Sequence, residues 1–127
     1  MKIDIIQVQS ASELEQAFTI RRQVFCIEQN VSEEIEMDEF DSTAKHILAT
    51  INDISVGTAR WRFTENGAKM ERFAVMKKYR GMGVGEVLVN YCIINFYPIR
   101  NEDSYHSSTI SIRIRTSLRN SQASVLH

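Results

Sequence analysis

The segment of this chain best suited to chemistry is the glycine-rich stretch at residues 75–85. Three glycines fall within five residues, between a predicted strand and a predicted helix: Gly81, Gly83 and Gly85. Glycine removes side chains where the backbone turns, so successive N–H groups can converge on an anion at the start of a helix. Local positive charge stands beside those donors, from Lys77, Lys78 and Arg80. The stretch predicts a phosphate-binding turn, with a purely structural turn as the alternative.

The spacing of these glycines does not fit two common nucleotide-binding motifs. A Walker loop requires G-x-x-x-x-G-K-[ST], and no Lys-Ser or Lys-Thr pair follows the glycines. The dinucleotide fingerprint G-x-G-x-x-G also fails, because Gly83 is followed by Gly85 and no βαβ unit opens the chain. A nucleoside triphosphatase or a dinucleotide-binding enzyme is therefore not expected.

The turn does fit the pattern R/Q-x-x-G-x-G/A, with Arg80, Gly83 and Gly85 at the fixed positions and Val75 five residues ahead. In this the sequence resembles the GNAT superfamily of acyl-CoA-dependent N-acyltransferases. Other matches extend the resemblance over about residues 20–97 and look like the pattern of a subgroup of small bacterial GNAT proteins. They are Arg22, Val24-Phe25, Glu28-Gln29, Glu36, Asp38, Asp41, His46 and Gly57-Thr58-Ala59-Arg60.

The resemblance implies a GNAT-like acyl-CoA N-acyltransferase fold, with acetyl-CoA as cosubstrate beside the strand that ends at Val75. Backbone groups of Phe73, Ala74 and Val75 would hold the acetyl carbonyl and the pantetheine arm. The pyrophosphate would lie on Arg80, Gly81, Met82, Gly83, Val84 and Gly85. An amine would attack the thioester directly in a ternary complex, an N–H near Val75 would stabilise the oxyanion, and CoA would leave as a thiol. The implied enzyme is an acetyltransferase acting on a primary amine of a small molecule or peptide, without a metal.

A protonated amine must lose its proton before it attacks, so the reaction needs a base or a chain of water molecules. Glu71 is the candidate catalytic residue, because period-2 alternation places it on one face of its strand with Phe73 and Val75. An ion pair with Arg60 or Arg62 is the structural alternative for this carboxylate.

Residues 28–41 form the only strongly charged stretch. They hold seven carboxylates and no Lys or Arg: Glu28, Glu33, Glu34, Glu36, Asp38, Glu39 and Asp41. Such a run is most simply a solvated loop or short helix. The functional alternative is an anionic rim that attracts a cationic amine, with Glu28 in the wall of the acceptor site. His46, just beyond this stretch, is expected to be a hydrogen-bonded strand residue.

Hydrophobic periodicity and turn signals give the elements that position this chemistry. The expected strands are 3–8, 46–51, 54–63, 69–75 and 107–115. Turns at Asn52-Asp53 and Asn66-Gly67 join the three central strands. The expected helices are 10–25, 84–94 and 117–126. The first helix begins at one of two overlapping capping boxes, Ser10 with Glu13 or Ser12 with Glu15, and Pro98 ends the second. The order β-α-βββ-α-β-α predicts an α/β class, an α+β arrangement with a mixed sheet.

Length and composition bound the class of protein. The 127 residues suit one domain over 1–127, and a net charge of −1 provides no general attraction to nucleic acid or an anionic membrane. The apolar runs are far shorter than the ~18–20 residues of a membrane span, and the N-terminus does not read as a signal peptide, so a cytoplasmic protein is expected. Cys26 and Cys92 are isolated thiols, which suggests neither a disulfide framework nor a zinc site.

The C-terminal part departs from the family pattern. Asn120, Ala123 and Leu126 fit N-x-x-A-x-x-[LF]-Y, but His127 stands where a tyrosine often serves as general acid. The final strands of the family are missing, so the strand at 107–115 would leave an unpaired edge, and a homodimer or strand-exchanged oligomer is expected. Two other functions stay open: a non-catalytic acyl-CoA-binding or oligomerising remnant of the fold, and an unrelated phosphate-binding or regulatory module.

Overall fold

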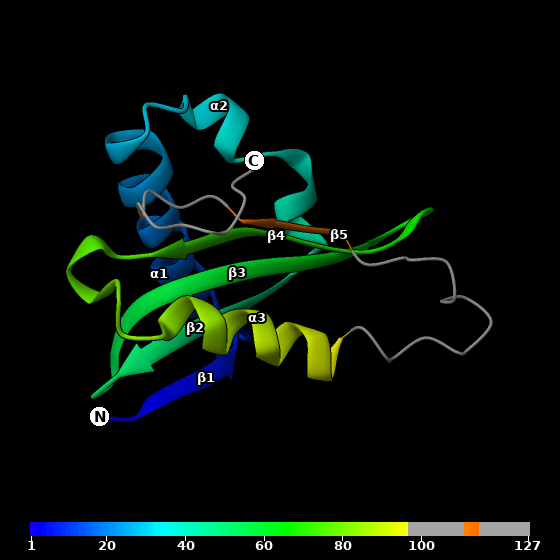
Figure 1. Ribbon diagram of the computed structural model, residues 1–127. Coiled ribbons are helices and arrows are strands. Elements are labelled where there is room, and N and C mark those ends of the chain that lie inside the picture. The colour runs from blue at the N-terminus through cyan, green and yellow to red at the C-terminus, as the bar shows by residue number, and fades with distance from the viewer. Residues whose placement is uncertain (97–110, 115–127) are drawn as a thin grey trace.

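The computed structural model describes residues 1–96 and 111–114. Within them, a five-stranded sheet has the order β1-β2-β3-β4-β5 (Figure 1). Its strands are β1 (Ile3–Gln7), β2 (Lys45–Ile51), β3 (Ile54–Thr64), β4 (Gly67–Val75) and β5 (Ser111–Ile114). Neighbours from β1 to β4 are antiparallel, whereas β5 is parallel to β4. This sheet confirms the predicted α+β class with a mixed sheet and the predicted contiguity of the three central antiparallel strands.

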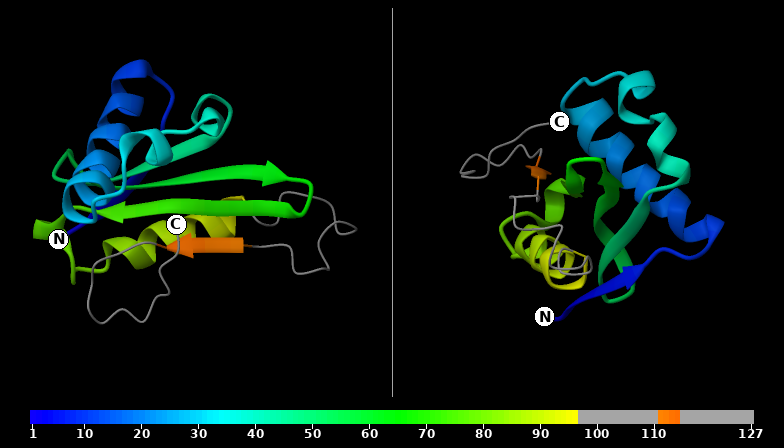
Figure 2. Two further views of the ribbon diagram at one scale, coloured as in Figure 1. Left: turned by 90° about the horizontal axis from the view of Figure 1, so that it is seen from above. Right: turned by 90° about the vertical axis from the view of Figure 1, so that its right-hand side faces the viewer.

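Helices cover both faces of the sheet. The helical elements are α1 (Ala11–Arg21), the π-helix η1 (Arg22–Glu28), α2 (Glu33–Glu36), the 3₁₀ helices η2 (Glu39–Ser42) and η3 (Lys77–Tyr79), and α3 (Val84–Asn95). Figure 2 shows α1 and α2 on one face and α3 on the other. The predicted first helix is therefore confirmed as α1 continued by η1. The predicted helix at 117–126, Pro98 and the motif ending at His127 lie outside the described residues.

The boundaries of these elements follow local signals. Ser10 caps α1 by accepting a 3.1 Å hydrogen bond from Glu13 N–H, while the Glu13 carboxylate accepts one from Gln9 N–H at 2.7 Å. Ser10 of the first predicted capping box is thus the N-cap, while the Glu13 carboxylate bonds to the residue before the N-cap and not to Ser10 N–H. Asn52 and Asp53 have φ values of 52° and 67°, the left-handed geometry of a tight hairpin turn, as predicted.

Two apolar clusters hold the helices against the sheet. On the α1 side the cluster comprises Ala17, Ile20, Val24, Phe25, Leu48 and Ala74. On the α3 side the larger cluster includes Trp61 of β3, whose ring stacks on Phe96 with centroids 4.7 Å apart. Gly57 lets α3 approach β3 closely, because a Cβ there would lie 3.0 Å from Val84 Cγ1. The first turn of α3 is therefore fixed against the centre of the sheet.

A β-bulge interrupts β4 at Arg72. The register between β3 and β4 shifts between Thr58 and Arg60, and Arg72 has a φ of 59°. Phe73 consequently packs in the α3-side cluster, whereas Glu71 pairs with Arg60 on the α1 side. The predicted alternation, with Glu71 on the same face as Phe73, is wrong because the extra residue changes the face.

No helix in the described part of the chain has both the length and the apolar character needed to cross a membrane.

Candidate functional site

The glycine-rich turn lies between the end of β4 and the start of α3. Gly81 and Gly83 have φ values of 83° and 92°, in the left-handed region that residues with a Cβ rarely adopt. Gly83 also caps α3, and its carbonyl accepts the 3.1 Å hydrogen bond from Val87 N–H that closes the first helical turn. The conformation of the backbone therefore favours glycine at both positions.

The backbone amides of this turn form a row of potential hydrogen-bond donors. Among residues 1–96 and 111–114, the N–H groups of residues 81–85 make no hydrogen bond. A Cβ built on Gly81 or Gly83 would meet no heavy atom within 4 Å, so open space adjoins the turn. The N-terminus of α3 adds partial positive charge at the same place. The arrangement can bind a phosphate-sized anion through main-chain donors.

The peptide group between Val75 and Met76, at the end of β4, is held in place by a hydrogen bond to β3. Met76 N–H donates to Val56 O of β3 at 2.9 Å. Because successive N–H groups of a strand point in alternate directions, the Val75 N–H points away from β3. In the described structure, β5 pairs with β4 no further than Phe73. The Val75 amide therefore lies beyond that pairing, on the side of β4 that leads to the turn.

The three cations near the turn differ in their surroundings. Lys77 and Lys78 are exposed. Arg80 instead donates from Nε to Val75 O at 2.9 Å, and its two Nη atoms donate to the Glu28 carboxylate at 3.1 and 2.5 Å. Glu28 thus balances the charge that Arg80 would bring to a phosphate. The same contact argues against a place for Glu28 in the wall of an acceptor site.

Glu71, the candidate base, is buried among cations. Its Oε2 accepts hydrogen bonds from Arg62 Nε at 2.8 Å and Arg60 Nε at 3.1 Å, and its side chain is 3% exposed. Burial alone would raise the pKa of this carboxyl, but hydrogen bonds from Arg62 and Arg60 bring it below its usual value. The structure thus contains the ion pairs that are the alternative to a base, and a carboxylate held in this way is a weak proton acceptor.

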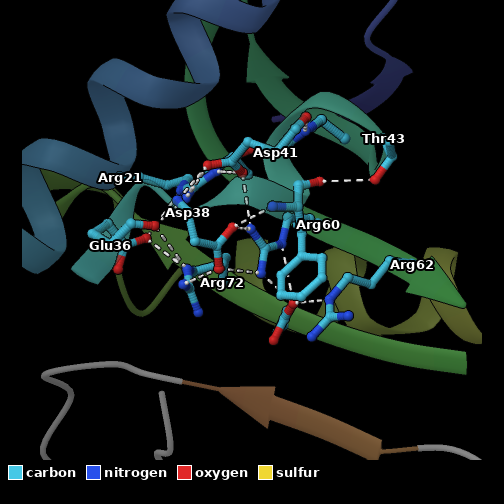
Figure 3. A network of polar contacts seen from close by, with 12 residues as sticks. Arg21, Glu36, Asp38, Asp41, Thr43, Arg60, Arg62 and Arg72 are labelled. Atoms are coloured by element: carbon cyan, nitrogen blue, oxygen red, sulfur yellow. Dashed lines mark hydrogen bonds and ion pairs between the residues drawn. The ribbon is translucent and has the colours of Figure 1, made fainter. Parts of the chain in front are cut away.

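Three buried arginines hold the acidic segment against the sheet (Figure 3). Each comes from a different element and is at most 6% exposed: Arg21 of α1, Arg60 of β3 and Arg72 of β4. Their partners are three carboxylates of the segment: Glu36, Asp38 and Asp41. The six side chains form a closed ring, in which each guanidinium bridges two carboxylates and each carboxylate bridges two guanidiniums. We call these six residues the ionic ring.

The distances around the ionic ring are those of direct ion pairs. From Arg21, Nε lies 3.0 Å from Glu36 Oε2 and Nη1 lies 2.7 Å from Asp41 Oδ1. From Arg60, Nη1 lies 2.7 Å from Asp38 Oδ1 and 2.9 Å from Asp41 Oδ1. From Arg72, Nε lies 3.0 Å from Glu36 Oε2 and Nη2 lies 3.0 Å from Asp38 Oδ2.

The ionic ring revises both interpretations of the acidic segment. Glu36 is fully buried and Asp41 is 12% exposed, so these carboxylates belong neither to a solvated loop nor to an open anionic rim. The solvated interpretation holds only for the exposed members Glu33, Glu34 and Glu39. Burial alone would raise the pKa of Asp41, but hydrogen bonds and charge from Arg21 and Arg60 lower it.

His46 is a buried strand residue, as predicted. Its Nε2 lies 3.0 Å from the Asp41 carbonyl, so the neutral ring donates from Nε2. Burial lowers the pKa of this imidazole below its usual value of 6.5. No group of three or more His, Cys, Asp or Glu side chains in the described part of the chain is arranged to hold a metal ion.

The family model of the acetyltransferase (GNAT) domain matches residues 8–114. The chain belongs to the GNAT acetyltransferase family. This confirms the resemblance carried by the turn at residues 80–85 and by the pattern before it.

Two curated relatives come from Bacillus subtilis (strain 168). The uncharacterized N-acetyltransferase YjcF is 39% identical over 77 residues, which cover 61% of this GNAT chain and 55% of YjcF. The uncharacterized protein YyaT is 40% identical over 91 residues, which cover 69% of this chain and 62% of YyaT. The chain therefore spans little more than half the length of these relatives.

The fold of this GNAT chain also matches solved structures. The crystal structure of Escherichia coli ElaA superposes with a TM-score of 0.64 at 26% identity, over 76% of this chain and 74% of ElaA. The crystal structure of an acyl-CoA N-acyltransferase from Pseudomonas aeruginosa superposes with a TM-score of 0.67 at 20% identity, over 73% of this chain and 69% of that chain. The arrangement of sheet, α1 and α3 is therefore that of an acyl-CoA N-acyltransferase fold.

Two members of the ionic ring were not singled out by sequence patterns. Arg21 occupies a core position of α1, four residues after the buried Ala17, and Arg72 occupies the bulge. A signal for Arg21 does exist in the sequence, because a cation on the buried stripe of a helix needs a carboxylate partner. No comparable signal marks the position of the bulge.

Proposed function

We propose that this GNAT chain binds acetyl-CoA and transfers the acetyl group to a primary amine of a small molecule or peptide. The observation that supports the proposal best is the row of main-chain amides at residues 81–85, which have no partner within the described residues. The pyrophosphate of acetyl-CoA would accept hydrogen bonds from these amides. Lys77 and Lys78, which are exposed beside the turn, would add positive charge.

The thioester would lie along the end of β4, beyond Phe73. Its carbonyl oxygen would accept a hydrogen bond from the Val75 N–H, which points away from β3. As the amine attacks, a C–N bond forms, the C–S bond breaks, and CoA leaves as a thiol. One such donor typically contributes about 3–4 kcal/mol to the stability of the transition state. Direct attack in a ternary complex would lower the entropic barrier further, by up to ~7–11 kcal/mol.

The proton of the amine would pass to water in this mechanism. Glu71 is not retained as the base, because its carboxylate is buried and paired with Arg60 and Arg62 on the face opposite Phe73. The main catalytic effects would therefore be stabilisation of the oxyanion by the Val75 N–H and the lower entropic barrier of the ternary complex.

The proposal is tested by the release of CoA thiol from acetyl-CoA in the presence of amines. A suitable panel contains a polyamine, an aminoglycoside and a peptide with a free lysine and a free α-amine. Burial raises the pKa of the Cys92 thiol to about 12, so this thiol gives little background with a thiol reagent near pH 8. Turnover with any member supports the enzyme. Tight CoA binding without turnover for every amine supports the non-catalytic remnant, and nucleotide binding without CoA binding supports a different phosphate-binding module.

A further inference from the structure

We infer that Arg80 is a positioning residue, which acts with Glu28 to hold the CoA site in its binding geometry and is not itself a phosphate ligand. The inference rests on the proposed acetyl-CoA function and concerns the same site. It starts from the contacts of one guanidinium, which donates to the carbonyl of Val75 and to both oxygens of Glu28. We call this set of contacts the Arg80 clamp.

The Arg80 clamp is an ordered arrangement. The side chains of Arg80 and Glu28 are 11% and 19% exposed, so solvent screens their pairing only in part. Two parallel N–H to oxygen contacts, at 3.1 and 2.5 Å, fix the relative orientation of the guanidinium and the carboxylate. Bidentate pairs of this kind are stronger and more directional than single ion pairs.

The clamp joins three parts of the site that are distant in sequence. Glu28 is the last residue of η1, Val75 is the last residue of β4, and Arg80 directly precedes the glycine turn. The peptide between Val75 and Met76 is held at both ends, its carbonyl by Arg80 Nε and its N–H by Val56 O. The clamp therefore sets the direction of the end of β4 relative to the turn.

The electrostatics of the pair favour positioning over phosphate binding. Glu28 lies against the guanidinium, so the two charges largely cancel at the distance of a phosphate. A turn without the clamp would retain its amides but would have to be ordered when CoA binds, and that ordering lowers affinity. Loss of either partner is thus expected to weaken CoA binding, even when the change leaves more positive charge near the phosphates.

Three variants separate a positioning role of Arg80 from a role as phosphate ligand, because the two roles predict opposite changes in the Kd for CoA when Glu28 loses its charge. Glu28→Gln breaks the ion pair and frees the charge of Arg80, while Arg80→Lys keeps the charge and loses the bidentate geometry. Each is expected to raise the Kd for CoA, measured by calorimetry, about tenfold, in line with the value of a charged hydrogen bond. The Kd for CoA of the double variant is expected to be no higher than that of the single variant that binds CoA less tightly, because both changes remove the same contact. Tighter or unchanged binding by Glu28→Gln would show that Arg80 is a phosphate ligand, and additive effects would also overturn the clamp.

A second measurement needs no ligand. Hydrogen exchange of the ligand-free protein reports whether the clamp orders the end of β4, and the Met76 amide is expected to exchange faster in Glu28→Gln. The matched control is Glu15→Gln, which breaks the exposed pair between Glu15 of α1 and Arg22 of η1 and should change neither exchange nor CoA affinity. If the unaltered chain binds no CoA, the proposed function fails, but the exchange result still decides the clamp: unchanged Met76 exchange in Glu28→Gln refutes it.

Discussion

Arg60 Nη1 lies 2.7 Å from Asp38 Oδ1, a contact that joins the acidic segment to the middle of the sheet. Arg60 is 1% exposed, and its second carboxylate in the ionic ring is Asp41. Removing charges from water is costly, so such a cluster is tolerated only when every charge is matched and hydrogen-bonded. The closed ring meets that condition. It explains how a segment with seven carboxylates can pack against the sheet.

Replacing Arg60 by methionine should destabilise the protein strongly. Arg60→Met keeps much of the buried volume but leaves Asp38, Asp41 and Glu71 without their shared partner. The free energy of unfolding, measured with urea, should fall by about 3–5 kcal/mol. Arg22→Met is the control, because the Arg22–Glu15 pair is solvent-exposed and should contribute at most about 1 kcal/mol. Similar losses in the two variants would mean that the ring adds no stability.

Glu71→Gln should affect stability and leave the chemical step nearly intact. The amide keeps the shape of the side chain but loses the ion pairs with Arg60 and Arg62, at a cost of about 2–3 kcal/mol. With a responsive amine, kcat measured well below the unfolding temperature should change only a few-fold. A general base is typically worth about 10²–10⁴-fold in rate. A drop of that size in folded protein would restore Glu71 to the role of base.

The secondary structure could be predicted because its signals are local. The N-cap at Ser10, the hairpin turn at Asn52-Asp53 and the glycine turn at 81–85 each depend on a few neighbouring residues. Their side chains or backbone angles determine the local conformation almost independently of the rest of the fold. The glycine-rich turn belongs to this class, which is why its position between β4 and α3 follows from the sequence.

The ionic ring could not be predicted because its pairs depend on tertiary packing. Arg21 and Glu36 are 15 positions apart, and Arg72 and Asp38 are 34 apart. The sequence shows that residues 28–41 are acidic, but not which arginines face them. The bulge adds a second obstacle, since one extra residue in β4 moves Glu71 to the opposite face from Phe73. Period-2 alternation has no means of detecting that change.

Because of the bulge, the glycine variant at Arg72 should be more stable than the valine variant, the reverse of the usual order in a strand. Its φ of 59° favours glycine over a β-branched residue, so Arg72→Val should be less stable than Arg72→Gly by about 1–2 kcal/mol. Both variants lose the same guanidinium, and urea unfolding compares them directly. Lys69 in the same strand lies before the bulge, and there valine should be the more stable of the two substitutions. The same order at both positions would mean that the backbone of β4 is regular.

The stability of the fold should begin to fall below pH 6.5 because of His46. Burial lowers its pKa in the folded state, so the unfolded chain binds a proton where the folded chain does not. This contribution is complete above the usual value of 6.5 and is lost as the pH falls through the folded pKa. The carboxylates Asp38 and Asp41 follow at lower pH, because their pKa values lie below the usual 3.8.

His46→Gln tests the first of these steps. Glutamine can still donate to the Asp41 carbonyl but does not titrate, so the decline of the melting temperature just below pH 6.5 should become shallower. The decline at lower pH, which belongs to the carboxylates, should persist. An unaltered pH profile in this variant would assign the first step to another group.

Gly83→Asp and Gly83→Asn together test whether the glycine turn binds the pyrophosphate. Aspartate and asparagine tolerate a positive φ better than most residues, and a Cβ at this position meets no heavy atom within 4 Å. Both variants should therefore fold, and they differ in charge rather than shape. A carboxylate about 4 Å from a phosphate charge costs about 4 kcal/mol at an effective dielectric of ~20, which salt reduces. The Kd for CoA should thus be about 100-fold higher for the aspartate variant than for the asparagine variant. Equal affinities would place the pyrophosphate elsewhere, because only the charge separates the two side chains.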